Sequence, residues 1–206
     1  MLLLSSFSDP RAKDILLQGE VLALPTETVY GVGVRFDDEN AYQRLCQCKG
    51  RSPSKPIAVR CGPDFPLDDY FLLTPAIKRV RKKFLPGPLT VLVKAKESAP
   101  YQTHLGTFVA GIRIPGKKEL LDFLSSLPFA LQVTSANRSG SPALKDRQKV
   151  IEVFNDSPLV KAIVEGKCES GTPTTVVSLV GDSPLIIRQG DVTKEEIDQA
   201  FFGKGD

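Results

Sequence analysis

The residues best suited to chemistry lie in four short polar segments, each beside an apolar run. Hydroxyl, amide and cationic groups dominate these segments, and general bases are scarce in them. Such groups position anions and stabilise developing negative charge, which favours phosphoryl or nucleotidyl transfer. The candidate residues are Thr26, Thr28 and Tyr30 in the first segment, Lys49, Arg51 and Lys55 in the second, Ser135, Asn137 and Ser139 in the third, and Thr174 and Thr175 in the fourth.

The second segment carries three cations within seven residues. On its own, such a run of charge is typical of a solvated loop. Two prolines and a glycine shape residues 49–56, however, and the apolar run 57–59 follows at once. A loop of this kind is able to hold its cations inward against an anion.

The other segments are individually weak signals, because plain turns use the same residue types. The third segment follows the apolar run 129–133, and ligands of α/β sheets bind where strands end. The fourth combines hydroxyl groups with backbone amides on a turn, which suits phosphate oxygens. Taken together, the four segments predict a cleft rich in cations and hydroxyl groups.

Helices and strands alternate along the sequence and are expected to bring these segments to strand ends. Asp9–Pro10, Thr74–Pro75 and Thr193 are typical of helix starts. The apolar runs predict one twisted sheet, mixed in strand direction, in an α/β or α+β domain. Predicted strands cover 21–24, 57–59, 89–93, 109–114, 129–133, 159–164, 175–180 and 185–188, and predicted helices cover 8–19, 37–48, 74–84, 117–127, 146–154 and 193–202.

The composition is that of a soluble globular domain, with 206 residues, 41% hydrophobic and 25% charged. It excludes a disordered chain, a collagen and a coiled coil. The formal net charge of +3 is smaller than is typical of a duplex-binding protein, although it leaves room for a local basic cluster. Four cysteines and a single histidine give no zinc-ligand spacing, so free, mostly buried thiols are expected.

No targeting or membrane segment is expected. The apolar residues 1–4 have no basic residues before them and form too short a run for a secretion signal. No stretch approaches the roughly 18 apolar residues that a membrane span requires. We therefore expect a cytoplasmic protein that does not associate with membranes.

Six motifs follow one another in an order and spacing typical of one family. They are Pro25–Gly31, Lys49-x-Arg51 with Lys55–Pro56, Phe84–Thr90, Arg113–Pro115, Thr134–Gly140 with its Ser-x-Asn signature, and Thr174–Val177. Over roughly residues 10–190, these motifs resemble the YrdC-like threonylcarbamoyl-AMP synthases. The paired Lys-x-Arg and Ser-x-Asn signatures are the most specific part of the resemblance.

The resemblance implies a fold and a reaction. The fold would be an α/β domain with a twisted, mostly mixed sheet, flanked by helices, and a large positively charged cavity. The reaction would convert L-threonine, bicarbonate and ATP to threonylcarbamoyl-AMP and pyrophosphate, with Mg²⁺ carried by ATP and no metal site on the protein. A separate tRNA threonylcarbamoyl transferase complex would use the product in the t6A modification of tRNA.

The resemblance also implies a domain organisation. Longer family members have a second, C-terminal domain, for which the residues after Arg188 leave no room. We therefore expect a single YrdC-like domain over residues 1–206, with its core at about 10–190 and a C-terminal helix at about 193–203. Without the longer members' linker, the site would be more open or partly covered by this helix.

Roles for single residues follow from the same resemblance. Arg51 suits a bidentate contact with the threonine carboxylate because of its planar guanidinium group. The catalytic candidates are Lys49, Arg51 and Lys55; the threonine and bicarbonate candidates are Thr26, Thr28, Tyr30, Arg51 and Ser135; the ATP candidates are Lys49, Lys55, Arg113, Asn137, Ser139, Thr174, Thr175 and Arg188.

Two residues are left open. Glu27 either positions the amine of threonine or closes its turn. Arg60 lies in a stretch where some family members carry a histidine, so any role of that imidazole is lost or taken over.

Three other functions are compatible with the sequence. The first is an RNA-binding protein, which would bind RNA weakly through the basic cavity, although the sequence has no stripe of aromatic and basic residues. The second is an inactive paralogue of the same fold. The third is a carbamoyl-transfer domain of a larger maturation enzyme, which the absence of zinc-finger cysteines disfavours.

Overall fold

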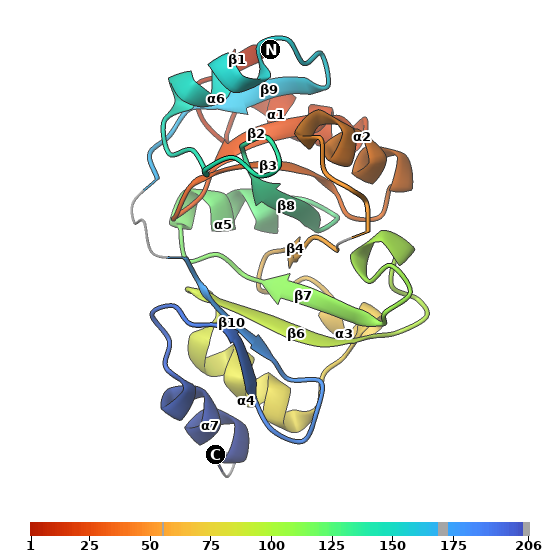
Figure 1. Cartoon of the computed structure of the whole chain (residues 1–206), viewed down its shortest axis with the longest axis vertical. Helices are drawn as coiled ribbons and strands as arrows, with labels where there is room; N and C mark the ends of the chain where they lie inside the picture. The colour runs from red at the N-terminus through yellow and green to blue at the C-terminus, as the bar shows by residue number, and fades with distance from the viewer. Residues whose placement is uncertain (55, 169–172, 204–206) are drawn as a thin grey trace.

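The computed structural model describes residues 1–54, 56–168 and 173–203 (Figure 1). Eleven strands of the described chain form one twisted sheet flanked by helices, which confirms the predicted fold class. The strands are β1 (Leu2–Leu4), β2 (Val21–Pro25), β3 (Tyr30–Arg35), β4 (Val59–Arg60), β5 (Phe71–Leu72), β6 (Leu89–Ala95), β7 (Val109–Arg113), β8 (Leu131–Ser135), β9 (Val160–Val164), β10 (Thr175–Ser178) and β11 (Leu185–Arg188).

The sheet is mixed, and its strand order interleaves distant parts of the chain. The order is β1-β9-β2-β3-β8-β4-β7-β6-β10-β11, with β5 paired to β6. Parallel pairs join β1 with β9, β9 with β2, β4 with β7, and β6 with β10. In Figure 1, β9, β2, β3 and β8 lie above β4, and β7, β6 and β10 lie below it. Strand β4 therefore joins the two halves of the sheet.

The helices begin at the residues that the sequence marks. Side-chain oxygens of Asp9, Asp38, Thr74, Asp146 and Thr193 accept backbone N–H groups in the first turns of their helices. These contacts satisfy donors that a helix cannot satisfy internally. The longer helices are α1 (Pro10–Leu17), α2 (Glu39–Lys49), α4 (Pro75–Phe84), α5 (Lys118–Ser125), α6 (Arg147–Phe154) and α7 (Lys194–Phe202); α3 (Leu67–Tyr70) is a single turn.

Five elements differ from the sequence-based expectation. Strands β1 and β5 and helix α3 were not predicted, because each is too short to show a periodic pattern. Strand β3 was missed because Gly31 and Gly33 interrupt its apolar residues, and glycine is disfavoured in strands. The predicted strand at 57–59 lies instead at Val59–Arg60, where β7 and β8 supply its partners.

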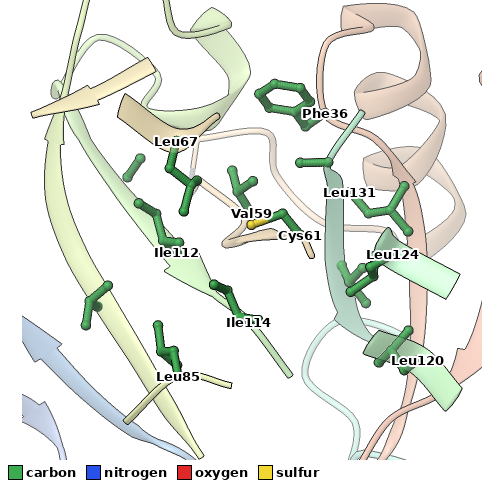
Figure 2. Packing of buried hydrophobic residues seen from close by; sticks show 14 of the residues in the cluster. Phe36, Val59, Cys61, Leu67, Leu85, Ile112, Ile114, Leu120, Leu124 and Leu131 are labelled. Atoms are coloured by element: carbon green, nitrogen blue, oxygen red, sulfur yellow. The ribbon is translucent and has the colours of Figure 1, made fainter. Parts of the chain in front are cut away.

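The two faces of the sheet are covered differently. One face carries the larger core, to which α1, α3, α4, α5 and α7 contribute. Figure 2 shows Val59 and Cys61 in this core, between Ile112 on one side and Leu131 on the other. The opposite face carries a second core whose helix residues come from α2 and α6, and whose strand residues come from β9, β2 and β3.

The second face continues beyond these helices over β4, β7, β6 and β10. Strand alternation makes the distinction clear: Val91, Ile112 and Val177 enter the larger core, whereas their neighbours Leu92 and Gly111 line a cavity on the other face. The half of this face that α2 and α6 leave uncovered is therefore the place for a ligand.

Two further expectations are tested here. All four cysteines are free thiols, and Cys46, Cys48 and Cys61 are buried, as predicted. Within the described residues, no helix is both long enough and apolar enough to cross a bilayer.

The glycines of β3 give a stability prediction. A Cβ atom at Gly31 would come within 2.6 Å of Val133 Cγ1 and 3.2 Å of the Thr134 carbonyl oxygen. We expect Gly31→Ala to lower the free energy of unfolding by about 1–3 kcal/mol, as overpacking usually does. Gly181→Ala is the matched control, because nothing lies within 4 Å of its Cβ position, and it should stay within about 0.5 kcal/mol. Guanidinium unfolding of both variants measures the difference; equal stabilities would contradict the close packing of β3 against β8.

Candidate functional site

Two adjoining cavities lie at the uncovered half of the sheet, with volumes of about 430 and 350 Å³. We call the larger one the sheet chamber, because strand residues form its floor. We call the smaller one the hairpin chamber, because the turn between β2 and β3 borders it. Both are lined by Arg60, Arg113, Thr174 and Arg188; the sheet chamber adds Pro56, Ile57, Ala58, Thr90, Leu92, Thr107, Val109, Gly111 and Val176, and the hairpin chamber adds Thr26, Thr28, Val29, Tyr30, Gly31, Thr134, Ser135, Ala143 and Pro173.

Strand register places two arginines side by side in these chambers. Strand β4 runs parallel to β7, with Val59 opposite Ile112 and Arg60 opposite Arg113. Val59 and Ile112 point into the larger core. Because side chains alternate along a strand, Arg60 and Arg113 point together to the other face, where both line the chambers.

Among the described residues, the carboxylate of Glu27 compensates these charges. Arg113, only 5% exposed, donates from Nη2 to Oε1 of Glu27, which forms a buried ion pair. Burial by itself would raise the pKa of Glu27, but the charges of Arg113 and Arg60 outweigh it and hold the pKa below its usual value. Glu27 is therefore an anion at neutral pH. Its side chain pairs with Arg113.

The arginines remain charged despite their burial. Desolvation, with the neighbouring Arg113 charge, lowers the pKa of Arg60 to about 9, so its guanidinium group keeps its proton at neutral pH. Desolvation and Arg113 also lower the pKa of Arg188. Arg188 donates from Nε and Nη2 to the Thr174 carbonyl oxygen at 3.1 and 2.8 Å, and Arg113 Nη1 lies 3.5 Å from Thr174 Oγ1. Thr174 is thus held between two guanidinium groups.

The turn between β2 and β3 is closed by Thr26. Its hydroxyl donates to the Val29 carbonyl at 2.7 Å and accepts the N–H groups of Thr28 and Val29 at 3.2 and 3.3 Å. Thr26 is buried, whereas Thr28 is partly exposed, and within the described residues its hydroxyl lies 3.3 Å from that of Thr26. Of the two threonines, Thr28 has the hydroxyl better placed for a ligand.

Tyr30 and Ser135 border the hairpin chamber from neighbouring strands. The Tyr30 hydroxyl donates to the Gly166 carbonyl at 2.7 Å, and burial raises its pKa to about 12. The Tyr30 hydroxyl is therefore already engaged within the protein. Ser135 ends β8 opposite Gly31 of β3, which brings the first and third predicted segments together.

The Lys-x-Arg and Ser-x-Asn signatures bind each other. Lys49, 3% exposed at the end of α2, donates from Nζ to the carbonyl oxygens of Ser135 and Asn137. In return, the Ser139 N–H donates to the Lys49 carbonyl at 2.9 Å, and Arg138 donates to the Cys48 carbonyl. These bonds fix the end of α2 to the loop after β8. Lys49 therefore lies behind that loop and outside the lining of the two chambers.

Three other candidates also lie outside the chamber lining. Asn137 donates from Nδ2 to the Arg138 and Ser141 carbonyls, at 2.8 and 2.7 Å, and Ser139 is exposed. Thr175 faces the opposite side of β10 from Thr174, and its hydroxyl donates to the Val192 carbonyl at 2.8 Å. Nucleotide contacts by these side chains stay predictions, to which the present hydrogen bonds give no direct support.

The Lys49–Pro56 loop is described only in part. Arg51 Nη2 lies 3.4 Å from the carbonyl oxygen of Pro56, a residue of the sheet chamber. Arg51 therefore lies at the rim of that chamber. The candidate Lys55 lies outside the described residues.

The sequence did not single out Arg60 as a site residue. The available signal was a lone charged residue between the apolar Val59 and Cys61. It could not be interpreted without the strand pairing that puts Arg60 beside Arg113. The ion pair of Glu27 with Arg113 was missed for the same reason, since 86 positions separate the two residues. Among the described residues, no group of three or more His, Cys, Asp or Glu side chains is arranged to hold a metal ion.

Fold and site together define an α/β protein that presents arginines and hydroxyl groups to a ligand on one face of a mixed sheet. The family model of the Sua5, YciO and YrdC proteins, described as "Telomere recombination", matches residues 14–190, and the chain belongs to this family. The resemblance found in the sequence is thereby confirmed.

Curated relatives and a solved structure extend this result. Threonylcarbamoyl-AMP synthase of Bacillus subtilis is 32% identical over 198 residues, which are 94% of this chain and 57% of the relative. The enzyme of the same name from Pyrococcus abyssi is 30% identical over 192 residues, or 92% of this chain and 56% of the relative. The crystal structure of P. abyssi Sua5 complexed with L-threonine matches with a TM-score of 0.88 and 27% identity, over 98% of this chain and 61% of that one. The chain thus spans less than two thirds of the length of these relatives.

The buried Lys49 gives a pH prediction. Desolvation lowers its pKa from the usual 10.5 to about 8, so the folded protein releases a proton that the unfolded chain keeps. The contribution of Lys49 to the free energy of unfolding should therefore rise with pH, by about 1 kcal/mol between about pH 7 and about pH 9. Guanidinium unfolding across this range should show a rise that is smaller in Lys49→Met than in the parent protein, by about 1 kcal/mol.

The comparison is made as a difference because the four thiols, whose pKa values are raised by burial, act in the opposite direction. Burial raises the pKa of Cys48 to about 11 and of Cys61 to about 12, so their contribution to stability falls above their usual 9.0. The contribution of Cys61 is the same in the parent and in Lys49→Met and cancels, whereas the charge of Lys49 affects the pKa of Cys48, so both proteins are compared in a Cys48→Ala background. The exposed Lys149→Met serves as the control and should keep the parent's pH dependence. A parallel pH dependence in Lys49→Met and the parent would contradict the lowered pKa.

Proposed function

We propose that this protein is an L-threonylcarbamoyladenylate synthase. It forms threonylcarbamoyl-AMP and pyrophosphate from L-threonine, bicarbonate and ATP, and the product serves the t6A modification of tRNA. The names of the two curated relatives and the L-threonine bound to P. abyssi Sua5 support this assignment. The reaction is a nucleotidyl transfer, which agrees with a site rich in cations and hydroxyl groups.

The observation that carries the proposal is the pair of chambers that meet at three arginines. The sheet chamber has apolar walls from Ile57, Leu92 and Val109, which suit a purine base. The hairpin chamber has hydroxyl groups from Thr28, Thr134 and Ser135, which suit a small polar amino acid. Bound in this way, ATP would direct its phosphates, and threonine its amine, toward the junction that the shared arginines line.

The first chemical step joins threonine to bicarbonate. The amine nitrogen of threonine attacks the carbon of bicarbonate, a C–N bond forms, and water leaves, which produces a carbamate. Glu27 stays ionised because Arg113 and Arg60 lower its pKa, so its carboxylate is able to accept a hydrogen bond from the amine. This role in positioning the amine is one of the two that the sequence left open.

The second step transfers the adenylyl group. A carbamate oxygen attacks the α-phosphorus of ATP, the bond from that phosphorus to the bridging oxygen breaks, and pyrophosphate leaves with the electron pair. Positive charge near the junction stabilises the negative charge that gathers on the phosphate oxygens. Magnesium, if bound with the triphosphate, would neutralise part of that charge, as is usual for nucleotide substrates.

The remaining predicted residues have places in this proposal. Arg51, at the rim of the sheet chamber, would bind the threonine carboxylate where that group extends from the hairpin chamber to this rim, and Lys55 of the same loop would bind bicarbonate or a phosphate. Lys49 would act by fixing the loop after β8 or, after a rearrangement, on a phosphate. Transfer to tRNA would belong to a separate threonylcarbamoyl transferase complex. We also propose a cytoplasmic location, where such a product is used.

The proposal predicts pyrophosphate release that requires both threonine and bicarbonate. The assay contains ATP and Mg²⁺ and omits each of the two other substrates in turn. Arg51→Ala should lower threonine-dependent turnover at least tenfold, because the carboxylate loses its bidentate partner. Arg11→Ala is the control, since Arg11 is exposed at the start of α1 and pairs with Asp9.

The outcome also separates the alternative functions. If the folded protein binds ATP but releases no pyrophosphate in response to threonine, the synthase assignment is wrong and the inactive paralogue is favoured. A salt-dependent affinity for RNA without turnover would favour the RNA-binding protein instead. Normal turnover of a folded Arg51→Ala variant would contradict only the carboxylate role of Arg51.

A further inference from the structure

Arg188 reaches the two chambers through a bulge in strand β11. This strand pairs antiparallel with β10, so that Ile186 stands opposite Val177. Arg188 stands opposite Val176, and Ile187 is the extra residue between these two pairs. Residues two apart on a regular strand share a face. Ile186, however, packs against the larger core, whereas Arg188 lines both chambers on the other face. The bulge therefore turns Arg188 from the core to the chambers, a use that bulges have beside functional sites.

The hydroxyl group of Thr175 fixes the chain that follows this bulge. Thr175 is buried, and its Oγ1 donates to the Val192 carbonyl oxygen at 2.8 Å. The same oxygen accepts the N–H groups of Gly190 and Val192 at 2.9 and 3.1 Å. A threonine hydroxyl has one donor and two acceptor sites, so all of them are used here. One side chain of β10 thus holds the segment 190–192 behind the strand.

Gly190 allows the segment to come this close to β10. A Cβ atom at this position would lie 2.4 Å from the Pro173 carbonyl oxygen and from the Thr175 nitrogen. Glycine is expected where one backbone approaches another in this way. The backbone of Arg188 is therefore fixed on both sides, by Ile186 in the core before it and by Gly190 against β10 after it.

The Arg188 side chain itself is exposed, so its direction depends on the groups that hold it. Its Nε and Nη2 donate to the Thr174 carbonyl oxygen at 3.1 and 2.8 Å. A long side chain that is free in water loses rotamer entropy when it binds an anion, and this loss weakens binding. A fixed backbone and a guanidinium group already held on Thr174 reduce that loss.

We infer that Thr175 is a positioning residue: its hydroxyl group, through Gly190 and Val192, keeps Arg188 directed into the chambers and thereby strengthens the binding of an anionic substrate. The inference rests on the proposed function only in taking ATP as that substrate. Thr174 and Thr175 then serve the site from opposite faces of β10. Thr174 lies at the chambers, and Thr175 acts from behind the strand without touching a ligand.

Three variants test the role of the hydroxyl group, with ATP affinity measured by isothermal titration calorimetry in the absence of threonine. Thr175→Val keeps the shape of the side chain and should weaken ATP binding about fivefold or more, because Arg188 is no longer held. Thr175→Ser keeps the hydroxyl group and should bind ATP within about twofold of the parent. Thr193→Val is the matched control, because it removes the hydroxyl group that caps α7 in the same part of the chain.

The control separates positioning from a general loss of stability. Thr193→Val should lower the midpoint of guanidinium unfolding, since a helix cap is lost, but should leave ATP affinity unchanged. If Thr193→Val weakens ATP binding as much as Thr175→Val does, loosening of this segment explains both results and the inference is wrong. Failure of Thr175→Ser to restore binding would also contradict a role of the hydroxyl group.

A double variant shows whether Thr175 acts through Arg188. Arg188→Met alone should weaken ATP binding about tenfold or more, because it removes a charge-assisted donor. In that background Thr175→Val should weaken binding no further, since the side chain that Thr175 positions is gone. Two effects that multiply would overturn the inference. Parent-like ATP binding by a folded Arg188→Met would overturn it as well.

Thr175→Cys keeps the test decisive if Thr175→Val does not fold. A thiol is a weak donor and a weak acceptor, so this variant should also bind ATP more weakly than the parent. Unchanged affinity in either folded variant would overturn the role of Thr175.

Pyrophosphate release separates this inference from the synthase assignment. If the parent releases pyrophosphate in response to threonine while both Thr175 variants bind ATP normally, the positioning role fails and the assignment stands. If ATP affinity depends on Thr175 through Arg188 but threonine causes no pyrophosphate release, the positioning role stands and the assignment fails.

Discussion

The parallel pairing of β4 with β7 is the constraint on which the site depends. It puts the guanidinium groups of Arg60 and Arg113 side by side on one face, while Val59 and Ile112 fasten the strands to the core on the other. Two like charges on loops would be able to move apart, whereas two like charges on paired strands are held next to each other by the backbone hydrogen bonds of the sheet. The pair is tolerated because Glu27, from a turn far away in sequence, supplies a buried carboxylate. The ion pair thus links the turn after β2 to the centre of the sheet, and the two chambers form on either side of it.

The elements that sequence reasoning found are those with local signals. Asp9 and Thr74, each followed by proline, mark helix starts by hydrogen-bonding chemistry that does not depend on distant residues. Strand β3 was missed because it contains two glycines, which are rare in strands. The glycines are required because Val133 of β8 packs against them, and this contact between distant residues is not visible in the local sequence. The same limit applies to the site. Strand-end segments were correctly singled out as polar clusters, but the face toward which Thr175 points depends on the register of β10 with its neighbours.

A motif shared by a family is not equivalent to a set of ligand contacts. Lys49 and Asn137 belong to the two most specific signatures, yet the Lys49 ammonium group binds the Asn137 carbonyl and the Asn137 amide binds carbonyls of its own loop. Removing one partner would leave buried acceptors unsatisfied, which is costly whether or not the residue touches a substrate. A residue type at such a position is therefore constrained by the architecture of the loop as well as by the ligand, and sequence alone does not separate these two demands.

The place where the helices end explains why this face is available to ligands. Helices α2 and α6 cover one face over β9, β2 and β3, and the same face continues uncovered over β4, β7, β6 and β10. Alternation along the strands is unchanged across this boundary, so residues that would be core positions under a helix become chamber walls. Leu92 and Val176 are apolar, as core residues are. Arg60 and Arg113 lie at equivalent positions on the same face of the sheet but carry charged groups. Glu27 offsets part of their cost in stability, and the N–H groups of Arg60 that have no acceptor among the described residues suit an anionic ligand on this face.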